Sequence, residues 1–204
     1  MGVFQHWPNR ITALRFLGAL GLFVIFALHG MRRVEELPAE RGLLQWAFWL
    51  FLVTSLSDVL DGYLARKGNH ITAFGRIADP FVDKVLVIGA MVFLAVMPWS
   101  QPFFPAWIVV VVLSREFLIT AIRGYVESQG AQFPADWFGK LKMFAQCIAV
   151  GVVIGIHAFG FEGETLRFWT LVGHWAVWAT LVTTVGSCFS YLGKTRRWLL
   201  DGGQ

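Results

Sequence analysis

Two pairs of aspartates stand close together between residues 57 and 85, and they account for four of the thirteen acidic residues of the chain. Asp58 and Asp61 are three residues apart, which places both on one face of a helix. Asp79 and Asp83, four residues apart, share a face in the same way. Four ionised carboxylates in one place repel one another, and two divalent cations would balance their charges. All-oxygen ligands suit Mg²⁺, with Mn²⁺ or Ca²⁺ as alternatives, and paired ions of this kind clamp the oxygens of a transferring phosphoryl group.

The sequence around the aspartates helps to decide between a metal site and an ordinary polar loop. In the second interpretation the four acids are simply solvated. Asp58 follows directly on an apolar run and Asp83 precedes one, which favours carboxylates held at a membrane edge, where an uncompensated charge is costly. Gly68 and Asn69, between the two pairs, are residue types that turn a chain back, so two helices would bring the pairs together.

The whole stretch resembles the signature of the CDP-alcohol phosphotransferase family and matches every fixed position of it, as Asp58-x2-Asp61-Gly62-x2-Ala65-Arg66-x8-Gly75-x3-Asp79-x3-Asp83. The resemblance implies an integral membrane enzyme with six transmembrane helices, usually a homodimer. It implies transfer of a substituted phosphate from a CDP-linked donor to an alcohol, with release of CMP. It further implies that the four aspartates hold two metal ions and that Asp83 is the general base.

Small residues after Asp61 indicate the donor side of the site. Gly62 and Ala65 would let a ligand approach the helix backbone, and the resemblance implies that this ligand is the cytidine nucleotide. Ordinary helix packing is the alternative for both. Arg66 would contact a diphosphate oxygen, or would serve only as a loop charge on the cytoplasmic side. Gly75 belongs to the same motif, and we assign it to the donor side as well.

The start of the first apolar run, PNRITALRFLG, is a second donor-side candidate. Asn9, Thr12 and Arg15 resemble the Asn-x2-Thr-x2-Arg opening of the phosphatidylglycerophosphate synthase branch of the family. Thr12 and Arg15 share a helix face. The alternative interpretation is an N-cap and an anchor at the membrane interface.

Basic residues later in the chain predict an anionic, phosphate-bearing acceptor. Arg115 and Glu116 lie within an apolar run, where a charge needs a partner or a ligand. The partner for Glu116 would be Arg115 or Arg123, in which case the pair serves helix packing. Lys140 and Lys142 are two residues apart and point to different faces of a helix, so at most one is central unless the helix starts between them. Both segments resemble the phosphatidylglycerophosphate synthase branch, in the Arg115-Glu116 pair and in Gly139-Lys140-x-Lys142. From their charge and position we assign Arg115, Arg123, Lys140 and Lys142 to the acceptor phosphate.

Transmembrane helices must position these residues. Of the 204 residues, 56% are hydrophobic and 15% charged, and the mean hydropathy of +0.60 is high for a soluble domain. We therefore expect an all-α, polytopic membrane protein that forms a single domain over residues 1–204, with a short interfacial segment at residues 2–9. Asp79 followed by Pro80 fits an N-cap at the start of the third span. The six expected spans are 11–30, 43–64, 80–98, 105–125, 139–158 and 166–191; the last offers no distinctive residue.

The distribution of Lys and Arg predicts the orientation. With six spans and the N-terminus inside, the loops rich in Lys and Arg all fall on one side. The positive-inside rule then places both termini and the aspartate motif on the cytoplasmic side of the cell inner membrane. The net charge of +4 reflects those loops and does not indicate nucleic-acid binding.

The resemblance thus implies transfer of a phosphatidyl group from CDP-diacylglycerol to glycerol-3-phosphate, with two Mg²⁺ or Mn²⁺ ions, by a homodimer among membrane lipids. The same chemistry with inositol phosphate, phosphatidylglycerol or serine as acceptor is an open alternative. A divalent-cation transporter is an alternative of a different class, but it has no evident use for Gly62, Ala65 and Arg66 at their fixed spacing.

Overall fold

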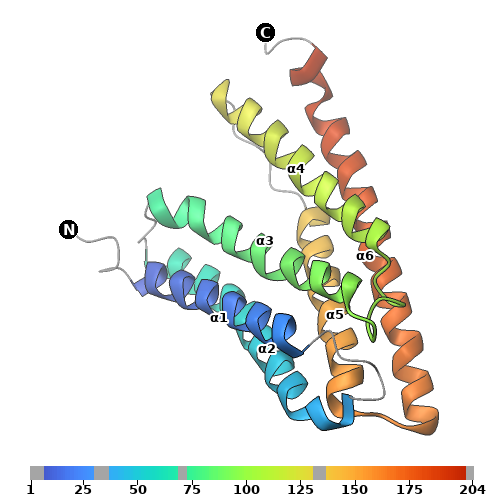
Figure 1. Ribbon diagram of the computed structural model, residues 1–204. Coiled ribbons are helices and arrows are strands. Elements are labelled where there is room, and N and C mark those ends of the chain that lie inside the picture. Colours follow the sequence, from blue (N-terminus) through green and yellow to red (C-terminus); the bar gives the residue numbers. More distant parts are fainter. Residues whose placement is uncertain (1–6, 30–36, 69–72, 131–136, 201–204) are drawn as a thin grey trace.

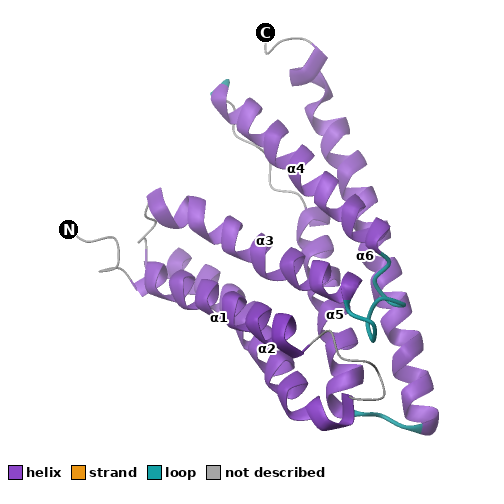
Figure 2. Cartoon of the chain, viewed as in Figure 1, coloured by secondary structure: helices purple, strands orange, loops and turns teal. Residues whose placement is uncertain are grey.

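The structure, a computed structural model, describes residues 7–29, 37–68, 73–130 and 137–200. The side chains of 7, 8, 29, 37–40, 58–68, 73–77, 79, 80 and 197–200 lie outside that description. Every regular element in the described ranges is an α-helix (Figure 2). The helices are α1 (Trp7–His29), α2 (Leu37–Gly68), α3 (Ala73–Val96), α4 (Ala106–Ser128), α5 (Trp137–Phe159) and α6 (Gly163–Leu200). The all-α prediction is confirmed for this part of the chain.

Each predicted span overlaps one helix, but one boundary prediction is wrong. Helix α3 begins at Ala73, so Asp79 lies seven residues into the helix and is not its N-cap. A proline inside a helix costs about 3 kcal/mol, and the other contacts of this 24-residue helix offset that cost, so residues 73–79 are helical ahead of Pro80. Helix α2 ends at Gly68, where the turn was predicted. Residues 2–6 of the expected interfacial segment lie outside the described residues, and α1 begins at Trp7.

Three helices in the described ranges are long and apolar enough to cross a membrane, over Asn9–Leu28, Trp137–Phe159 and Gly163–Arg196. Helix α4 is continuous, but its apolar run contains the charged residues Arg115, Glu116 and Arg123. The outer surface is strongly apolar, with exposed side chains such as Leu14 and Phe117. Exposure of such a surface to water is unfavourable, whereas contact with lipid tails is not.

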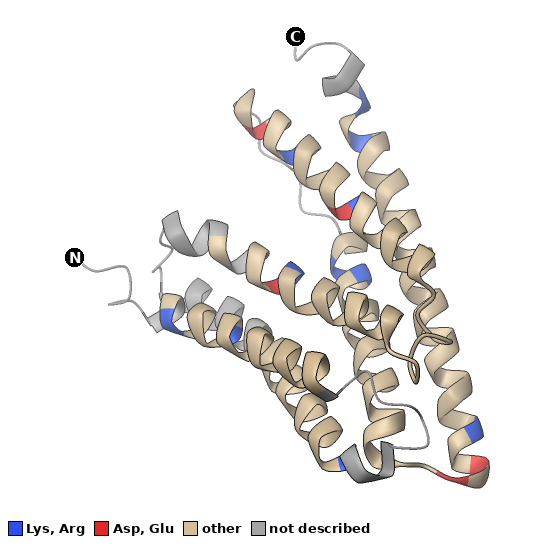
Figure 3. Ribbon diagram, viewed as in Figure 1, with Lys and Arg blue, Asp and Glu red and all other residues tan. Residues whose placement is uncertain are grey.

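The six helices pack into one bundle, in which α4 and α6 diverge from α1, α2 and α3 toward one end (Figure 1). Helix α1 packs against α2 and α3, α3 against α4, α4 against α6, α6 against α5, and α5 against α2. The shared core contains fully buried Leu22, Phe26, Leu94 and Val153. The N-terminal ends of α1, α3 and α5 and the C-terminal ends of α2, α4 and α6 lie toward the same end of the bundle. Figure 3 shows Lys and Arg gathered on the halves of the helices near that end, with a second charged group beside the α5–α6 connection.

Two contacts in which one partner is a glycine bring α1 close to its neighbours α2 and α3. The ring of Phe23 covers Gly89 of α3 and stacks on Phe93 at 5.5 Å between ring centroids. On the other side of α1, Thr54 of α2 lies so close to Gly18 that a Cβ there would be 2.7 Å from the threonine Oγ1. These two glycines let the polar face of α1 reach the interior of the bundle.

Candidate active site

Helix α1 turns a polar stripe inward at the predicted donor side. Asn9, Thr12 and Arg15 are all buried, although each belongs to a type that is usually exposed. Arg15 is only 3% exposed, and its guanidinium forms an ion pair with the carboxylate of Asp83 on α3. Asn9 lies within α1, so it is not an N-cap, and burial of Arg15 excludes the interfacial-anchor alternative.

The four aspartates of the motif lie on two helices that contact each other. Asp58 and Asp61 belong to the C-terminal part of α2, and Asp79 and Asp83 belong to the N-terminal half of α3. Only Asp83 has a described side chain, so the four-carboxylate cluster stays a prediction. The same holds for the donor-side residues of these helical segments, Gly62, Ala65, Arg66 and Gly75.

Asp83 provides the one direct test of metal fit. Its side chain is 17% exposed, and its buried Oδ1 faces the Arg15 guanidinium, an arrangement that leaves further lone pairs of the carboxylate for another cation. A carboxylate oxygen with unused lone pairs is the ligand type that Mg²⁺ and Mn²⁺ take. The residues of the motif therefore fit a hard divalent ion in their chemistry.

A second charged cluster is centred on Glu116, a buried residue in the middle of α4. Its Oε1 accepts a hydrogen bond from Arg115 Nη1 at 3.0 Å and another from Lys142 Nζ of α5. Its Oε2 lies 3.8 Å from Lys84 Nζ of α3. Three cations from three helices thus meet one carboxylate, and we call these four residues the Glu116 cluster.

Two neighbours hold the Glu116 cluster in place. Lys84 Nζ donates a hydrogen bond of 2.6 Å to Thr120 Oγ1, and that hydroxyl donates one of 2.6 Å to the Glu116 carbonyl. The Arg115 guanidinium lies over the ring of Tyr191 of α6, 5.4 Å from its centroid. Because Lys84 follows Asp83 directly, α3 joins the cluster to the aspartate motif.

The structure brings together two of the four basic residues predicted for the acceptor. Arg115 and Lys142 both contact Glu116, which confirms one of the predicted Glu116 pairings. Arg123 is exposed on α4, about two turns beyond Glu116. Lys140 is exposed on a different face of α5 from buried Lys142, as their spacing predicted.

Sequence reasoning missed Lys84, Thr120 and Tyr191. Lys84 carried a usable signal, since a charge inside a predicted span marks a candidate site residue. Tyr191 corrects the view that the last span offers no distinctive residue, because it supports Arg115 and lies against Gly139, where a Cβ would be 3.3 Å from its hydroxyl. Its sequence context, an apolar run, gave no such signal.

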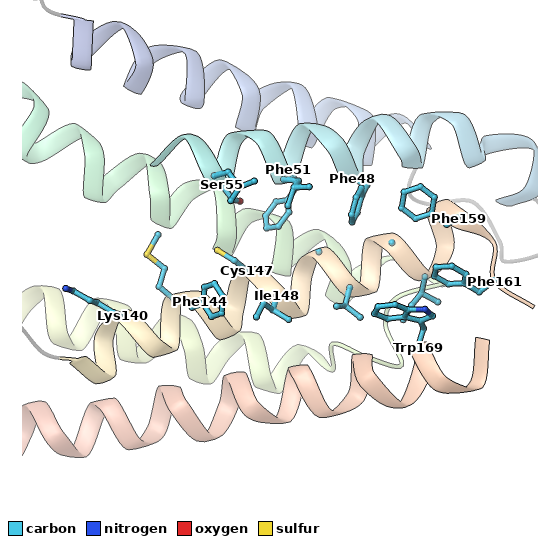
Figure 4. Close-up of a pocket in the computed structure, with 17 residues that line it drawn as sticks. Phe48, Phe51, Ser55, Lys140, Phe144, Cys147, Ile148, Phe159, Phe161 and Trp169 are labelled. Atoms are coloured by element: carbon cyan, nitrogen blue, oxygen red, sulfur yellow. The ribbon is translucent and has the colours of Figure 1, made fainter. Parts of the chain in front are cut away.

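An apolar groove of about 590 Å³ runs between α2 and α5 (Figure 4). Phe48, Phe51 and Ser55 of α2 face Phe144, Cys147 and Ile148 of α5 across it, and Phe159, Phe161 and Trp169 close its far end. Lys140 stands at the other end, and the groove reaches Leu56 of α2, two residues before Asp58. The groove therefore starts beside the aspartate motif and leads away into the apolar part of the bundle.

Sequence comparisons agree with the motif. The profile of the CDP-alcohol phosphatidyltransferase family matches residues 5–186. A Bacillus subtilis protein called CDP-diacylglycerol–glycerol-3-phosphate 3-phosphatidyltransferase is 35% identical over 191 residues, which cover 92% of this chain and 93% of the relative. Proteins of the same name from Rickettsia prowazekii, with 28% identity over 94% and 96% of the two chains, and from Haemophilus influenzae, with 29% identity over 76% and 80%, are also similar.

Proposed function

The chain belongs to the CDP-alcohol phosphatidyltransferase family, and we propose that it transfers a phosphatidyl group from CDP-diacylglycerol to glycerol-3-phosphate, giving phosphatidylglycerophosphate and CMP. The observation that carries the proposal is the Glu116 cluster, in which buried Arg115 and Lys142 meet Lys84, the residue that follows Asp83 in the chain. The printed names of the relatives support the same acceptor and donor.

The acceptor phosphate fits the charge of the Glu116 cluster. Arg115, Lys142 and Lys84 carry three positive charges against the single negative charge of Glu116, which leaves an excess of two. A phosphate monoester carries close to two negative charges at neutral pH. Arg115 Nε is buried without a hydrogen-bond acceptor among the described residues, and Lys142 has donors beyond the one used on Glu116, so both offer N–H groups to a phosphate.

Asp83 then stands where a proton must be removed. With the phosphate on the cation cluster, the primary hydroxyl of glycerol-3-phosphate points toward the aspartate motif, and Asp83 accepts its proton as general base. The alkoxide oxygen forms a bond to the phosphorus that bears diacylglycerol, and the bond from that phosphorus to the CMP oxygen breaks. The ion pair with Arg15 orients the Asp83 carboxylate for this role.

The divalent ions belong to the four aspartates in this proposal. Asp58, Asp61, Asp79 and Asp83 would hold two Mg²⁺ or Mn²⁺ ions, which supply neutralisation of the diphosphate and of the departing CMP. Asn9 and Thr12, with Gly62, Ala65, Arg66 and Gly75, would bind the cytidine diphosphate part of the donor.

The groove between α2 and α5 would hold an acyl chain of the donor. It is apolar and begins next to Asp58, so the lipid tail stays among apolar side chains while the diphosphate reaches the metal ligands. The protein is a membrane protein, in keeping with its family and its apolar helices. We further propose six transmembrane helices, an inner-membrane location with the site facing the cytoplasm, and a homodimer.

The test is CMP release by the purified protein with CDP-diacylglycerol and a panel of acceptors. We expect turnover with glycerol-3-phosphate and a phosphatidylglycerophosphate product. Turnover only with inositol phosphate, phosphatidylglycerol or serine would replace the acceptor and keep the chemistry. Absence of CMP with every acceptor, together with uptake of divalent ions into vesicles, would establish the transporter alternative instead.

A further inference from the structure

Glu116 has the wrong charge for a residue in a phosphate site, yet it is the centre of the cluster. It is 7% exposed, and both of its carboxylate oxygens face cations. Without it, buried Arg115 and Lys142 and the more exposed Lys84 would stand together with only their mutual repulsion. Long cationic side chains also lose much conformational freedom when they are held in one geometry, so an anchor is needed.

The geometry points to Glu116 as a positioning residue for the acceptor phosphate. We propose that its carboxylate holds Arg115 of α4 and Lys142 of α5 in register before the acceptor binds, without itself touching the substrate. By removing one positive charge from three, it also matches the cluster to a doubly charged phosphate. This inference rests on the proposed function for the identity of the acceptor.

Two buried donors near the cluster show where the phosphate would lie. Arg115 Nε and Gln146 Nε2 are buried and have no hydrogen-bond partner in the part of the chain that the structure describes. Gln146 lies one turn beyond Lys142 on α5 and shares its face. A buried donor left unpaired is costly, so donors that gather beside fixed cations indicate an anionic ligand.

The experiment compares Glu116→Gln and Glu116→Asp with the parent enzyme. Glu116→Gln keeps the shape and one acceptor oxygen but loses the charge that anchors Lys142 and Arg115. We expect the KM for glycerol-3-phosphate to rise about tenfold to hundredfold, with the KM for CDP-diacylglycerol changed by less than about twofold. Glu116→Asp keeps the charge, and we expect it to recover most of the loss. Glu127→Gln, an exposed change on the same helix, is the matched control and should leave both constants unchanged.

A double variant shows whether Glu116 acts through Lys142. If it does, Glu116→Gln adds little to the effect of Lys142→Met on the acceptor KM, because the group that it positions is already gone. Effects that multiply would overturn the inference, as would equal rises in the KM values of donor and acceptor. A lower acceptor KM in Glu116→Gln would show that Glu116 competes with the phosphate, which also overturns it.

Binding of inorganic phosphate separates this inference from the proposed function. Calorimetry of the folded parent and of Glu116→Gln needs no turnover, so it applies whichever alcohol is the acceptor. We expect phosphate to bind the parent more tightly than the variant by about tenfold or more. Equal binding would refute the positioning role even if the parent converts glycerol-3-phosphate. Conversely, weaker phosphate binding by the variant would support the positioning role of Glu116 even if another phosphorylated alcohol proved to be the acceptor.

Discussion

Removal of the Arg15 guanidinium is expected to reduce both stability and turnover, by two effects that can be separated. Arg15 is almost fully buried and pairs with Asp83, which is itself mostly shielded from water. Breaking a buried ion pair by removing one partner costs about 3–5 kcal/mol, because the other charge is left uncompensated. The residual exposure of Asp83 lowers that cost, so we expect Arg15→Met to lose about 3 kcal/mol of unfolding free energy.

The double variant Arg15→Met/Asp83→Asn removes both charges and tests the origin of that loss. If the uncompensated carboxylate is responsible, the second change restores about 2 kcal/mol of the stability lost by the first. Turnover must nevertheless stay absent, because the amide cannot accept a proton. From the single to the double variant, the unfolding free energy therefore rises while turnover stays absent. A general packing defect would not separate stability from activity in this way.

The assay is a denaturant titration of each purified variant in detergent micelles, together with CMP release from CDP-diacylglycerol. Leu14→Met, an exposed change on the same helix, is the control and should alter the unfolding free energy by less than about 0.5 kcal/mol. A double variant as unstable as the sum of its two single variants would refute the uncompensated-charge explanation. Full turnover by Arg15→Met would show that orientation of Asp83 does not depend on Arg15.

Four further outcomes are expected. A chelator should abolish turnover and Mg²⁺ or Mn²⁺ should restore it, whereas full activity without metal would remove the two-metal proposal. Asp58→Asn should regain part of its rate at high metal concentration, while Asp83→Asn, which loses about 10²–10⁴ in rate with the base, should not. Lys142→Met should raise the KM for glycerol-3-phosphate far more than Arg123→Ala does, since only the former removes a buried contact; similar rises would place the acceptor nearer the surface. Gly89→Ala should cost about 1–3 kcal/mol of unfolding free energy, because its methyl group would overlap the aromatic ring that covers Gly89; an unchanged value would mean that the ring moves freely.

The sequence predicted the helices well because long apolar runs have few other stable forms in a membrane. It predicted a turn at Gly68, where α2 ends, because glycine is a residue type that favours turns. The predicted start of α3 was wrong because the proline signal is local, whereas its cost of about 3 kcal/mol inside a helix is offset by the packing of the whole helix. Local rules therefore identified which segments are helical more reliably than they identified where one helix begins.

The composition of the Glu116 cluster was only half accessible from the sequence. Helical spacing correctly separated Lys140 from Lys142, because it depends on one helix alone. The meeting of Lys142 with Glu116 depends on how α4 and α5 approach each other, and Lys84 joins them from α3. No rule of spacing within one segment specifies contacts between three helices, so these partners required the structure.

The order of residues on α3 explains how Asp83 and the Glu116 cluster are kept at a fixed separation. Consecutive residues on an α-helix point about 100° apart. Asp83 can therefore turn toward Arg15 of α1 while Lys84 turns toward Glu116 of α4, with only one helix between them. If Asp83 takes the proton and the Glu116 cluster holds the phosphate, then the distance between the hydroxyl and the phosphate of the acceptor is matched by one rigid element. An acceptor with its phosphate farther from the reacting hydroxyl would not bridge the two clusters, which gives this arrangement a means of selecting among phosphorylated alcohols.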